Sequence, residues 1–482
     1  MLMFVVYLMT LAPSITWQHG GADSGELAAA ITELGIAHPP GYPTYMLLGR
    51  VWAILPLGGD IAHRLNILSA FSAAMSGVIT ALIIFRVFTV GGKSRNYRIF
   101  GAIFGGLLLM LAPLTWSQAT ITEVYAPGLL ICSVIIYVFL RKTDIASKTI
   151  FWGGLLIGIG TGVLPQIVLF LPVAALLILW RKIGLKSQVS IWYLTGIFGA
   201  GIFLGGSVFA YLPLRALAHP VANWGNPETL SNWWTLVTAQ QYQHLTTSLD
   251  ASWFIRLNQS LTQLALQISL PGMLLALLGV SWLWLQSPPD TVFLVLFGVG
   301  TLLFRVSYSA AGNIVYLLPL LLVLAIFAGG GLCVVLTWGR RYFSMSALVP
   351  LGIVLLASLI WRGTHTFPLM DISNDRQAYN FSRDILSELP ADAVIVTDRD
   401  ETTFSLWYQK SLSVRPDITV VDNRLIHYDW YIQNLRYQNV SLRPDMLQAD
   451  KINIPSRPVF YLITSENNSA IGFSYEMRAE TN

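Results

Sequence analysis

The sequence has little charge, and this shortage is its most informative feature. Only 11% of its 482 residues are Asp, Glu, Lys or Arg, whereas 54% are hydrophobic. A soluble domain carries roughly 25% charged residues. The composition therefore excludes an ordinary soluble protein and indicates an integral membrane protein that meets a lipid bilayer. Clustered Lys and Arg of the kind that bind nucleic acid are also missing, so we expect no nucleic-acid partner.

Cysteine is almost absent as well. The two cysteines, Cys132 and Cys333, both lie in apolar runs, which argues against a disulfide framework or a cysteine metal site. Aromatic residues are plentiful, with 16 Trp and 19 Tyr. They suit both interfacial belts and stacking on carbohydrate, and composition does not separate these two uses.

Long apolar runs predict the membrane domain. The first, from Met1 to about Trp17, lacks the basic region and cleavage site of a signal peptide and is barely long enough to span. A short helix from Tyr42 to Pro56 is expected to lie in the interface. With the first run, about eleven transmembrane helices are expected on a criterion of roughly 20 residues each; the other runs are 65–85, 99–114, 119–140, 150–163, 165–180, 190–214, 254–285, 291–306, 314–338 and 344–361.

Lys and Arg predict the orientation, because cytoplasmic loops are rich in them. The basic loops alternate with poor ones, so the N-terminus is expected inside, and the first outer loop (18–64) and everything after Trp361 outside. The residues of the basic loops are Arg86, Lys93, Arg95, Arg98, Arg141, Lys142, Lys148, Arg181, Lys182, Lys186, Arg340 and Arg341.

After Trp361 the composition becomes that of a soluble protein. Three apolar segments read as buried strands, and helical stretches at 401–410 and 428–437 follow the first two. This alternation predicts a small α/β domain with a parallel sheet. We therefore expect a transmembrane domain over 1–362 and an outer soluble domain over 363–482; the expected strands are 393–397, 417–421 and 459–463.

The most polar part of the N-terminal half runs from His19 to Pro43. A helix is expected from Ser24 to Leu34, with Gly35 as its left-handed C-cap. The following H-P-P-G-Y-P forbids helix and sheet, since proline fixes φ and removes backbone donors. Asp23 and Glu26 stand at the helix start, either as a capping box or as catalytic carboxylates.

The other expected outer loops also carry polar and aromatic residues. Arg305 falls in an apolar run with no other charge. Such residues at the edge of a span are functional by default, although each alone could be an interfacial anchor. Together they suit group transfer: a carboxylate takes a proton from a hydroxyl, arginines hold a phosphate, and aromatics stack on sugars. The residues concerned are Glu123, Tyr125, Arg215, Trp224, Arg305 and Tyr308.

Five blocks of the chain resemble a known family. These are A-D-S-G-E-L-A-A-A from Ala22 with G-I-A-H-P-P-G-Y-P, W-S-Q-A-T-I-T-E-V-Y from Trp116, Y-L-P-L-R-A from Tyr211, Y-L-L-P from Tyr316, and D-R-D-E-T-T-F-S-L-W-Y from Asp398. The pattern resembles glycosyltransferase family 117, the bacterial relatives of transmembrane protein O-mannosyltransferases, in the C-type glycosyltransferase superfamily.

This resemblance implies an α-helical polytopic membrane protein of the C-type glycosyltransferase kind in a bacterial plasma membrane. Its donor would be a polyprenyl-phosphate-linked sugar such as mannose, and its acceptor an outer-face hydroxyl of a protein or glycan. No metal is required, although an acidic pair could hold a divalent cation. The implied roles are general base for Asp23, assistance from Glu26 and Glu123, phosphate binding by Arg215 and Arg305, and substrate contacts by His38, Tyr42, Tyr125, Trp224 and Tyr308.

Two other classes of function stay open at this stage. A transporter or flippase of lipid-linked saccharide precursors would show inverted repeats and broken helices at matching positions, which the sequence does not display. A receptor would bind a polymer on its outer domain, where Asp398, Asp400 and Glu401 follow a strand. For these three residues we prefer the interpretation as solvent-exposed turn and helix-cap positions. Sugar transfer in membranes separates an enzyme from both.

Overall fold

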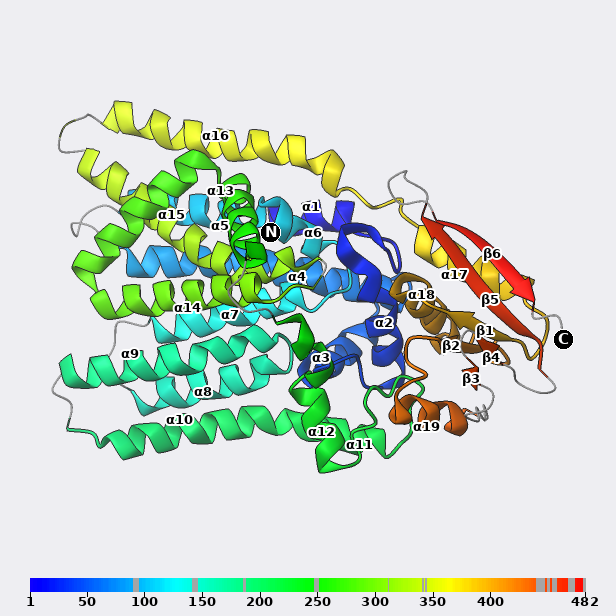
Figure 1. The fold of residues 1–482 in the computed structure, drawn as a ribbon. Helices are drawn as coiled ribbons and strands as arrows, with labels where there is room; N and C mark the ends of the chain where they lie inside the picture. The colour runs from blue at the N-terminus through cyan, green and yellow to red at the C-terminus, as the bar shows by residue number, and fades with distance from the viewer. Residues whose placement is uncertain are drawn as a thin grey trace.

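The computed structural model arranges the chain as a bundle of long helices with a small sheet domain at one end (Figure 1). It describes residues 1–89, 95–140, 146–184, 188–246, 251–310, 312–339, 342, 345–438, 447–448, 451–452, 457–466 and 473–479.

Seven helical segments of the described residues are long and apolar enough to cross a membrane, and an eighth is formed if the bent pair α5 and α6 counts as one. The bend between α5 (Arg95–Met110) and α6 (Pro113–Ala119) is 64°. The seven segments fall on α4 (Ile61–Val87), α9 (Phe170–Gly184), α10 (Ile191–Gly206) with α11 (Tyr211–Ala216), α13 (Ala251–Gln286), α14 (Pro288–Ser307), α15 (Leu318–Gly339) and, from Pro350 on, α16 (Met345–Met370).

The expected count of eleven spans is not confirmed, because several apolar runs form shorter helices. Helix α1 (Leu2–Thr10) is nine residues long, about 14 Å at 1.5 Å per residue, against a hydrocarbon core of about 30 Å. It ends in extended backbone at Leu11, two residues before Pro13, whose ring disfavours helix in the residue that precedes it. The other two short helices are α7 (Tyr125–Phe139) and α8 (Ser147–Thr161).

The two ends of the bundle differ in charge. Helices α4, α7 and α9 end, and α5, α8 and α10 begin, on the side away from the sheet domain (Figure 1). There Arg98 donates to the Phe85 carbonyl and Arg181 pairs with Asp290 at 2.5 Å. The structure thus groups basic helix ends on one side, and which side is cytoplasmic stays a prediction. Lys93, Arg141, Lys142, Lys186, Arg340 and Arg341 lie outside the described residues.

The polar stretch after α1 forms two helices, as predicted, but with a different cap. The left-handed residue after α2 (Ser24–Glu33) is Leu34, with φ 52°, so the expectation for Gly35 is wrong. Gly35 is needed for another reason: a Cβ there would lie 2.5 Å from the Ala222 carbonyl oxygen. That carbonyl accepts from the Ile36 N–H at 2.7 Å, which joins two outer loops. The second helix is α3 (Pro43–Ala53), within the expected range 42–56. Its place in the membrane interface stays a prediction.

The C-terminal residues form the expected α/β domain, with one addition. Strands β1, β2 and β5 are parallel as predicted, and β6 extends the sheet antiparallel in the order β2-β1-β5-β6. Helix α16 runs to Met370, so the expected boundary at 362 falls inside it. The elements are α17 (Gln377–Glu388), β1 (Val394–Thr397), α18 (Asp400–Ser411), β2 (Thr419–Asp422), α19 (Asp429–Tyr437), the hairpin β3 (Leu447–Gln448) and β4 (Lys451–Ile452), β5 (Val459–Glu466) and β6 (Phe473–Ala479).

The sheet domain is docked through α18 on the segment between α1 and α4. The Trp17 indole donates to the Glu401 carbonyl at 3.0 Å, and the Ala62 N–H donates to the Tyr408 hydroxyl at 3.2 Å. A Cβ at Gly25 would lie 2.4 Å from the Phe404 carbonyl oxygen. Helices α2 and α18 therefore touch backbone to backbone, and this segment and the sheet domain form one packed unit.

Candidate active site

Asp23 and Glu26 flank the start of α2, yet they do not form a capping box. Asp23 is the N-cap residue, and its side chain makes no cap hydrogen bond. Glu26 is fully buried and turns to His38: its Oε1 accepts from the His38 backbone N–H at 2.7 Å, and its Oε2 lies 2.8 Å from Nδ1. A buried carboxylate needs such partners. The capping-box alternative is therefore wrong.

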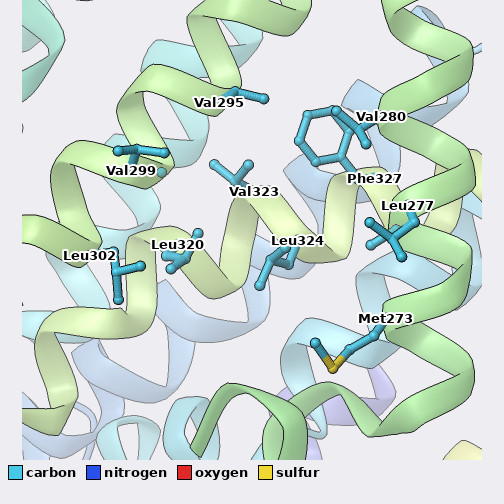
Figure 2. A pocket seen from close by; sticks show the side chains of 12 residues that line it. Met273, Leu277, Val280, Val295, Val299, Leu302, Leu320, Val323, Leu324 and Phe327 are labelled. Atoms are coloured by element: carbon cyan, nitrogen blue, oxygen red, sulfur yellow. The ribbon is translucent and has the colours of Figure 1, made fainter. Parts of the chain in front are cut away.

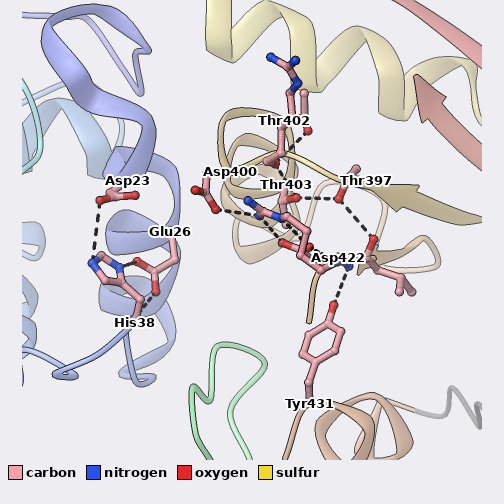
Figure 3. Close-up of polar contacts among 12 residues, drawn as sticks. Asp23, Glu26, His38, Thr397, Asp400, Thr402, Thr403, Asp422 and Tyr431 are labelled. Carbon is pink, nitrogen blue, oxygen red and sulfur yellow. Dashed lines mark hydrogen bonds and ion pairs between the residues drawn. The ribbon is translucent and has the colours of Figure 1, made fainter. Parts of the chain in front are cut away.

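His38 connects the two carboxylates because its loop turns back on itself. Gly41 has φ +87° and Tyr42 φ +42°, and the Gly41 N–H donates to the His38 carbonyl at 2.8 Å. The Tyr42 ring meets the His38 ring edge-on at 5.2 Å. On its other side, His38 Nε2 lies 3.9 Å from Asp23 Oδ2 (Figure 3). Glu26, His38 and Asp23 thus form one row.

The charges in this row depend on each other. Burial alone would lower the pKa of His38, but the charges of Glu26 and Asp23 and the Glu26 hydrogen bond outweigh it and raise that pKa to about 10. Protein atoms surround Asp23, and this desolvation raises its pKa to about 6 although the His38 charge opposes the rise. The Asp23 side chain is still 38% exposed. At neutral pH the row therefore holds an imidazolium and an accessible carboxylate.

Glu123 lies in the turn between α6 and α7 and faces the same row. It is 3% exposed, and its Oε2 accepts from the Val124 N–H at 3.2 Å. Burial raises the pKa of Glu123 well above its usual value, and the charge of Asp23 adds to this rise. Glu123 is therefore suited to donate a hydrogen bond, whereas Asp23 is suited to accept a proton.

A strip of tyrosines leads away from the carboxylates. Tyr125 begins α7 and packs its ring against Tyr316 at 5.7 Å between centroids, and Tyr316 packs against Tyr308 at the same distance. Tyr308 follows directly after α14. Tyr316 was not among the predicted site residues, although it opens the Y-L-L-P block that carried the resemblance. The strip connects the surroundings of Glu123 with the end of α14.

Arg305 lies in the last turn of α14, close to this strip. It is 4% exposed, and its Nε and Nη1 have no hydrogen-bond partner among the described residues. A buried guanidinium without partners is costly, and an anionic ligand would satisfy it. On α13, Arg256 donates to the Val306 carbonyl at 2.7 Å, so a second cation stands next to this turn.

An apolar pocket lies along the same two helices. Its volume is about 290 Å³, and α13, α14 and α15 contribute its walls (Figure 2). Leu302, which lines it, stands one turn before Arg305. A hydrocarbon chain can fill such a space next to the buried cation. The lining residues are Met273, Ala276, Leu277, Val280, Val295, Gly298, Val299, Leu302, Leu320, Val323, Leu324 and Phe327.

Two predicted residues of the segment between α10 and α12 differ in their placement; α12 is Leu230–Val237. Trp224 is 5% exposed, and its ring lies 6.3 Å from that of His38. Arg215 instead donates through Nε to the Leu34 carbonyl at 2.6 Å and through Nη2 to the Glu33 carbonyl at 3.2 Å. These bonds satisfy carbonyls at the C-terminus of α2, where a cation is favourable. The structure thus gives Arg215 a capping role.

The sheet domain contributes residues that the sequence did not place at the site. Trp224 also packs against Trp407 of α18 and Trp430 of α19, at 6.3 and 5.4 Å between centroids. Asp400, in the first turn of α18, pairs with Arg424 at 2.7 Å, and Arg424 holds the buried Asp422 at 2.6 Å (Figure 3). The charge of Asp400 contributes to the raised pKa of Asp23. The end of the sheet domain that carries α18 therefore faces the row.

Within the described ranges, no group of three or more His, Cys, Asp or Glu side chains is arranged to hold a metal ion.

The fold defines the class of protein. The chain is a polytopic α-helical membrane protein with a C-type glycosyltransferase-like fold and a small C-terminal α/β domain. It is similar to ArnT from Cupriavidus metallidurans bound to undecaprenyl phosphate, with a TM-score of 0.56 and 13% identity over 96% of this chain and 90% of that one. The apo structure of ArnT gives a TM-score of 0.54 and 12% identity, over 87% and 88% of the two chains.

Sequence comparison points to a particular family. Residues 23–187 match the model of the N-terminal domain of the protein O-mannosyl-transferase TMEM260, and residues 378–472 match TMEM260-associated domain 2. The chain is 24% identical to mouse TMEM260 in an alignment of 455 residues and 22% identical to that of Dictyostelium discoideum in an alignment of 481 residues. Each alignment covers 89% of this chain. The chain spans 62% and 57% of the lengths of these two relatives, both named protein O-mannosyl-transferases.

Proposed function

We propose that this protein is a membrane glycosyltransferase that moves a sugar, in the first place mannose, from a polyprenyl phosphate to a hydroxyl group of a protein or glycan. One observation carries the proposal: a tyrosine strip lies within reach of the charge of an accessible carboxylate, Asp23, and ends at Tyr308, three residues after a buried guanidinium without described partners, Arg305. Such a strip suits a sugar between a base and a phosphate. The naming of the relatives as O-mannosyl-transferases supports the reaction type.

The chemistry around Arg305 supports a lipid-linked phosphate donor. Its guanidinium would hold the phosphate in bidentate fashion, and the apolar pocket on α13, α14 and α15 would take part of the polyprenyl chain. The ArnT structure with undecaprenyl phosphate, which shares the fold, supports a lipid-linked donor. Since Arg215 is engaged with the end of α2, Arg305 carries the phosphate role in this proposal.

The reaction follows from the charges of the carboxylates. Asp23 takes the proton of the acceptor hydroxyl as its oxygen bonds to the anomeric carbon. The bond between that carbon and the phosphate oxygen breaks, and the polyprenyl phosphate leaves with the electron pair, beside Arg305. Attack from the face opposite the leaving group inverts the anomeric centre. Glu123, as the protonated acid, would donate a hydrogen bond to the sugar, and Tyr125 and Tyr308 would contact its faces.

The bilayer position completes the proposal. The site and the sheet domain would face the outer side of a bacterial plasma membrane, opposite the basic helix ends. Cysteines at Ala146 and Ser387, both exposed in the structure, in a chain without Cys132 and Cys333, would be modified by an impermeant thiol reagent from opposite sides. Modification of both from the outer side of intact cells contradicts this orientation.

The activity is tested with purified protein in detergent, a labelled polyprenyl-phosphate mannose, and a Ser/Thr peptide or a glycan as acceptor. We expect label in the acceptor from the parent chain and loss of this signal in Asp23→Asn. Assays with EDTA and with Mg²⁺ or Mn²⁺ restored determine whether a divalent cation takes part. A folded parent that transfers no sugar from any of several polyprenyl phosphate sugars refutes the proposal. Movement of the intact donor across the membrane of protein-containing vesicles, without transfer of its sugar, would identify a flippase.

A further inference from the structure

Glu26 is fully occupied by His38. Both of its oxygens are engaged, one with the backbone N–H and one with Nδ1 of the same residue. Exposure rises along the row, from 0% for Glu26 through 15% for His38 to 38% for Asp23. Only the outermost carboxylate is open to a ligand. This order suggests that the two inner residues act on the outer one.

The contact between His38 and Asp23 leaves the Asp23 carboxylate free to react. Nε2 and Oδ2 are 3.9 Å apart, which is too long for a hydrogen bond and short enough for charge attraction. Asp23 also makes no cap bond to α2. Its oxygens therefore keep their acceptor capacity although an imidazolium stands beside them.

We propose that Glu26 and His38 form a built-in counter-ion for Asp23: Glu26 orients the imidazolium, and the imidazolium holds the Asp23 carboxylate in place and ionised. This inference rests on the proposed function, in which Asp23 is the base. It makes His38 a positioning residue that acts through Asp23, where the sequence had suggested a substrate contact.

The surroundings of Asp23 explain why a counter-ion is needed. Burial and the charges of Glu26 on α2 and of Asp400 and Glu401 on α18 all raise the pKa of Asp23, and Glu123 stands on a third side. Among the groups that act on Asp23 in the described part of the chain, His38 lowers its pKa. Arg424 neutralises part of the Asp400 charge through their ion pair. Without His38, Asp23 would hold a proton near neutral pH and could not serve as a base.

The test is the pH dependence of transfer in His38→Gln, which keeps a polar side chain and removes the charge. An opposite charge within about 4–6 Å shifts a carboxyl pKa by about 1–3 units. We therefore expect the acidic limb of kcat to move upward by about 1–3 pH units, with kcat at high pH near that of the parent and KM for the donor unchanged. A loss of equal size at every pH, or a higher donor KM, overturns the inference.

His19→Gln is the matched control. His19 belongs to the same outer loop, and its ring nitrogens contact the Thr120 hydroxyl and the Leu369 carbonyl at 3.0 and 3.3 Å. It is absent from the groups that act on Asp23. We expect its acidic limb to coincide with that of the parent. A shift as large as that of His38→Gln would attribute the effect to disturbance of the loop and overturn the inference.

A second measurement does not depend on activity. In protein with ¹⁵N-labelled histidine, the chain's seven His report their ring charge by NMR. We expect the signals of one ring to stay those of a cation up to about pH 10. These signals should be missing from the spectrum of His38→Gln, and in Glu26→Gln the same ring should lose its proton at lower pH. A His38 ring that titrates near 6.5 refutes the counter-ion even if transfer is intact. A cationic ring in a folded parent without transfer refutes the proposed function alone.

Discussion

Replacement of Asp23 by Asn separates chemistry from folding at this position. Asn has almost the same shape but cannot take the proton of an acceptor hydroxyl. Loss of general base catalysis is expected to lower kcat by roughly 10²–10⁴-fold. The fold should be little affected, because Asp23 makes no cap hydrogen bond. Burial and the neighbouring acids raise the pKa of Asp23 in spite of the His38 charge, so folding does not favour the ionised carboxyl group and loss of its charge costs little stability.

The assay measures turnover of labelled donor at saturating acceptor and at pH 8, where Asp23 is ionised in the parent. A thermal melt of the same detergent-purified protein reports stability. Asp371→Asn is the matched control, since Asp371 is exposed and its side chain accepts, within the described ranges, from the nearby Ser373 N–H, which Asn can also do. Its turnover and melting temperature should equal those of the parent.

Asp23→Ala adds a test of the structure itself. A side chain that caps α2 would cost about 1 kcal/mol on removal, whereas the observed geometry predicts no such loss. Asp23→Ala should therefore melt close to Asp23→Asn and be equally inactive. If Asp23→Asn turns over like the parent, Asp23 is not the base and Glu123 becomes the candidate. If Asp23→Ala is about 1 kcal/mol less stable than the parent and Asp23→Asn is not, the Asp23 side chain caps α2 after all.

Three further predictions follow from the contacts around the site. Arg305→Lys should raise the KM for the donor more than it lowers the melting temperature, because Lys lacks the planar fork; an unchanged KM in a folded variant removes Arg305 from the site. Gly25→Ala should lower the free energy of unfolding by about 1–3 kcal/mol and reduce transfer, because its Cβ would lie 2.4 Å from the Phe404 carbonyl oxygen. The control is Gly196→Ala, whose Cβ would meet nothing within 4 Å, and it should have the melting temperature of the parent. Folding raises the pKa of His38 from 6.5 to about 10, so protonation of its ring stabilises the fold fully below pH 6.5 and progressively less as pH rises through 10. The melting temperature of the parent should therefore fall between pH 7 and 10, and that of His38→Gln should fall less.

The local parts of the fold could be predicted from sequence, whereas the breaks between them could not. Helices α2 and α3 and the three parallel strands follow from periodicity, proline placement and apolar runs. The number of spans does not, because an apolar run looks the same whether its helix is straight, bent or short. Helix α13 contains Ser269 with φ +66°, two residues before Pro271, and α5 and α6 meet at 64°. Such breaks depend on what the helix packs against.

The site was predicted in composition but not in pairing. Asp23, Glu26 and His38 were expected near each other because they share one loop, and Glu123 was expected on the same face. That Glu26 holds His38 depends on how the chain turns back after α2, and that Arg215 bonds the carbonyls of Leu34 and Glu33 depends on how two separate loops fold together. Spacing along the chain encodes neither. For the same reason the sequence could not place Asp400, 377 positions after Asp23, beside it.

The two regions that match the TMEM260 domains meet at Asp23. Residues 23–187 supply the row and Glu123, and residues 378–472 supply α18 with Asp400 and Glu401. Because these acids raise the pKa of Asp23 while His38 lowers it, the proton affinity of the carboxylate depends on how α18 sits on α2. That position is fixed where Gly25 meets the Phe404 backbone. Arg305, Tyr308 and the apolar pocket lie between the two matched regions, on α13 to α15. In the proposed reaction, the proton-accepting half of the site is therefore built by the segments that match the two domain models, and the lipid-binding half by the membrane helices between them.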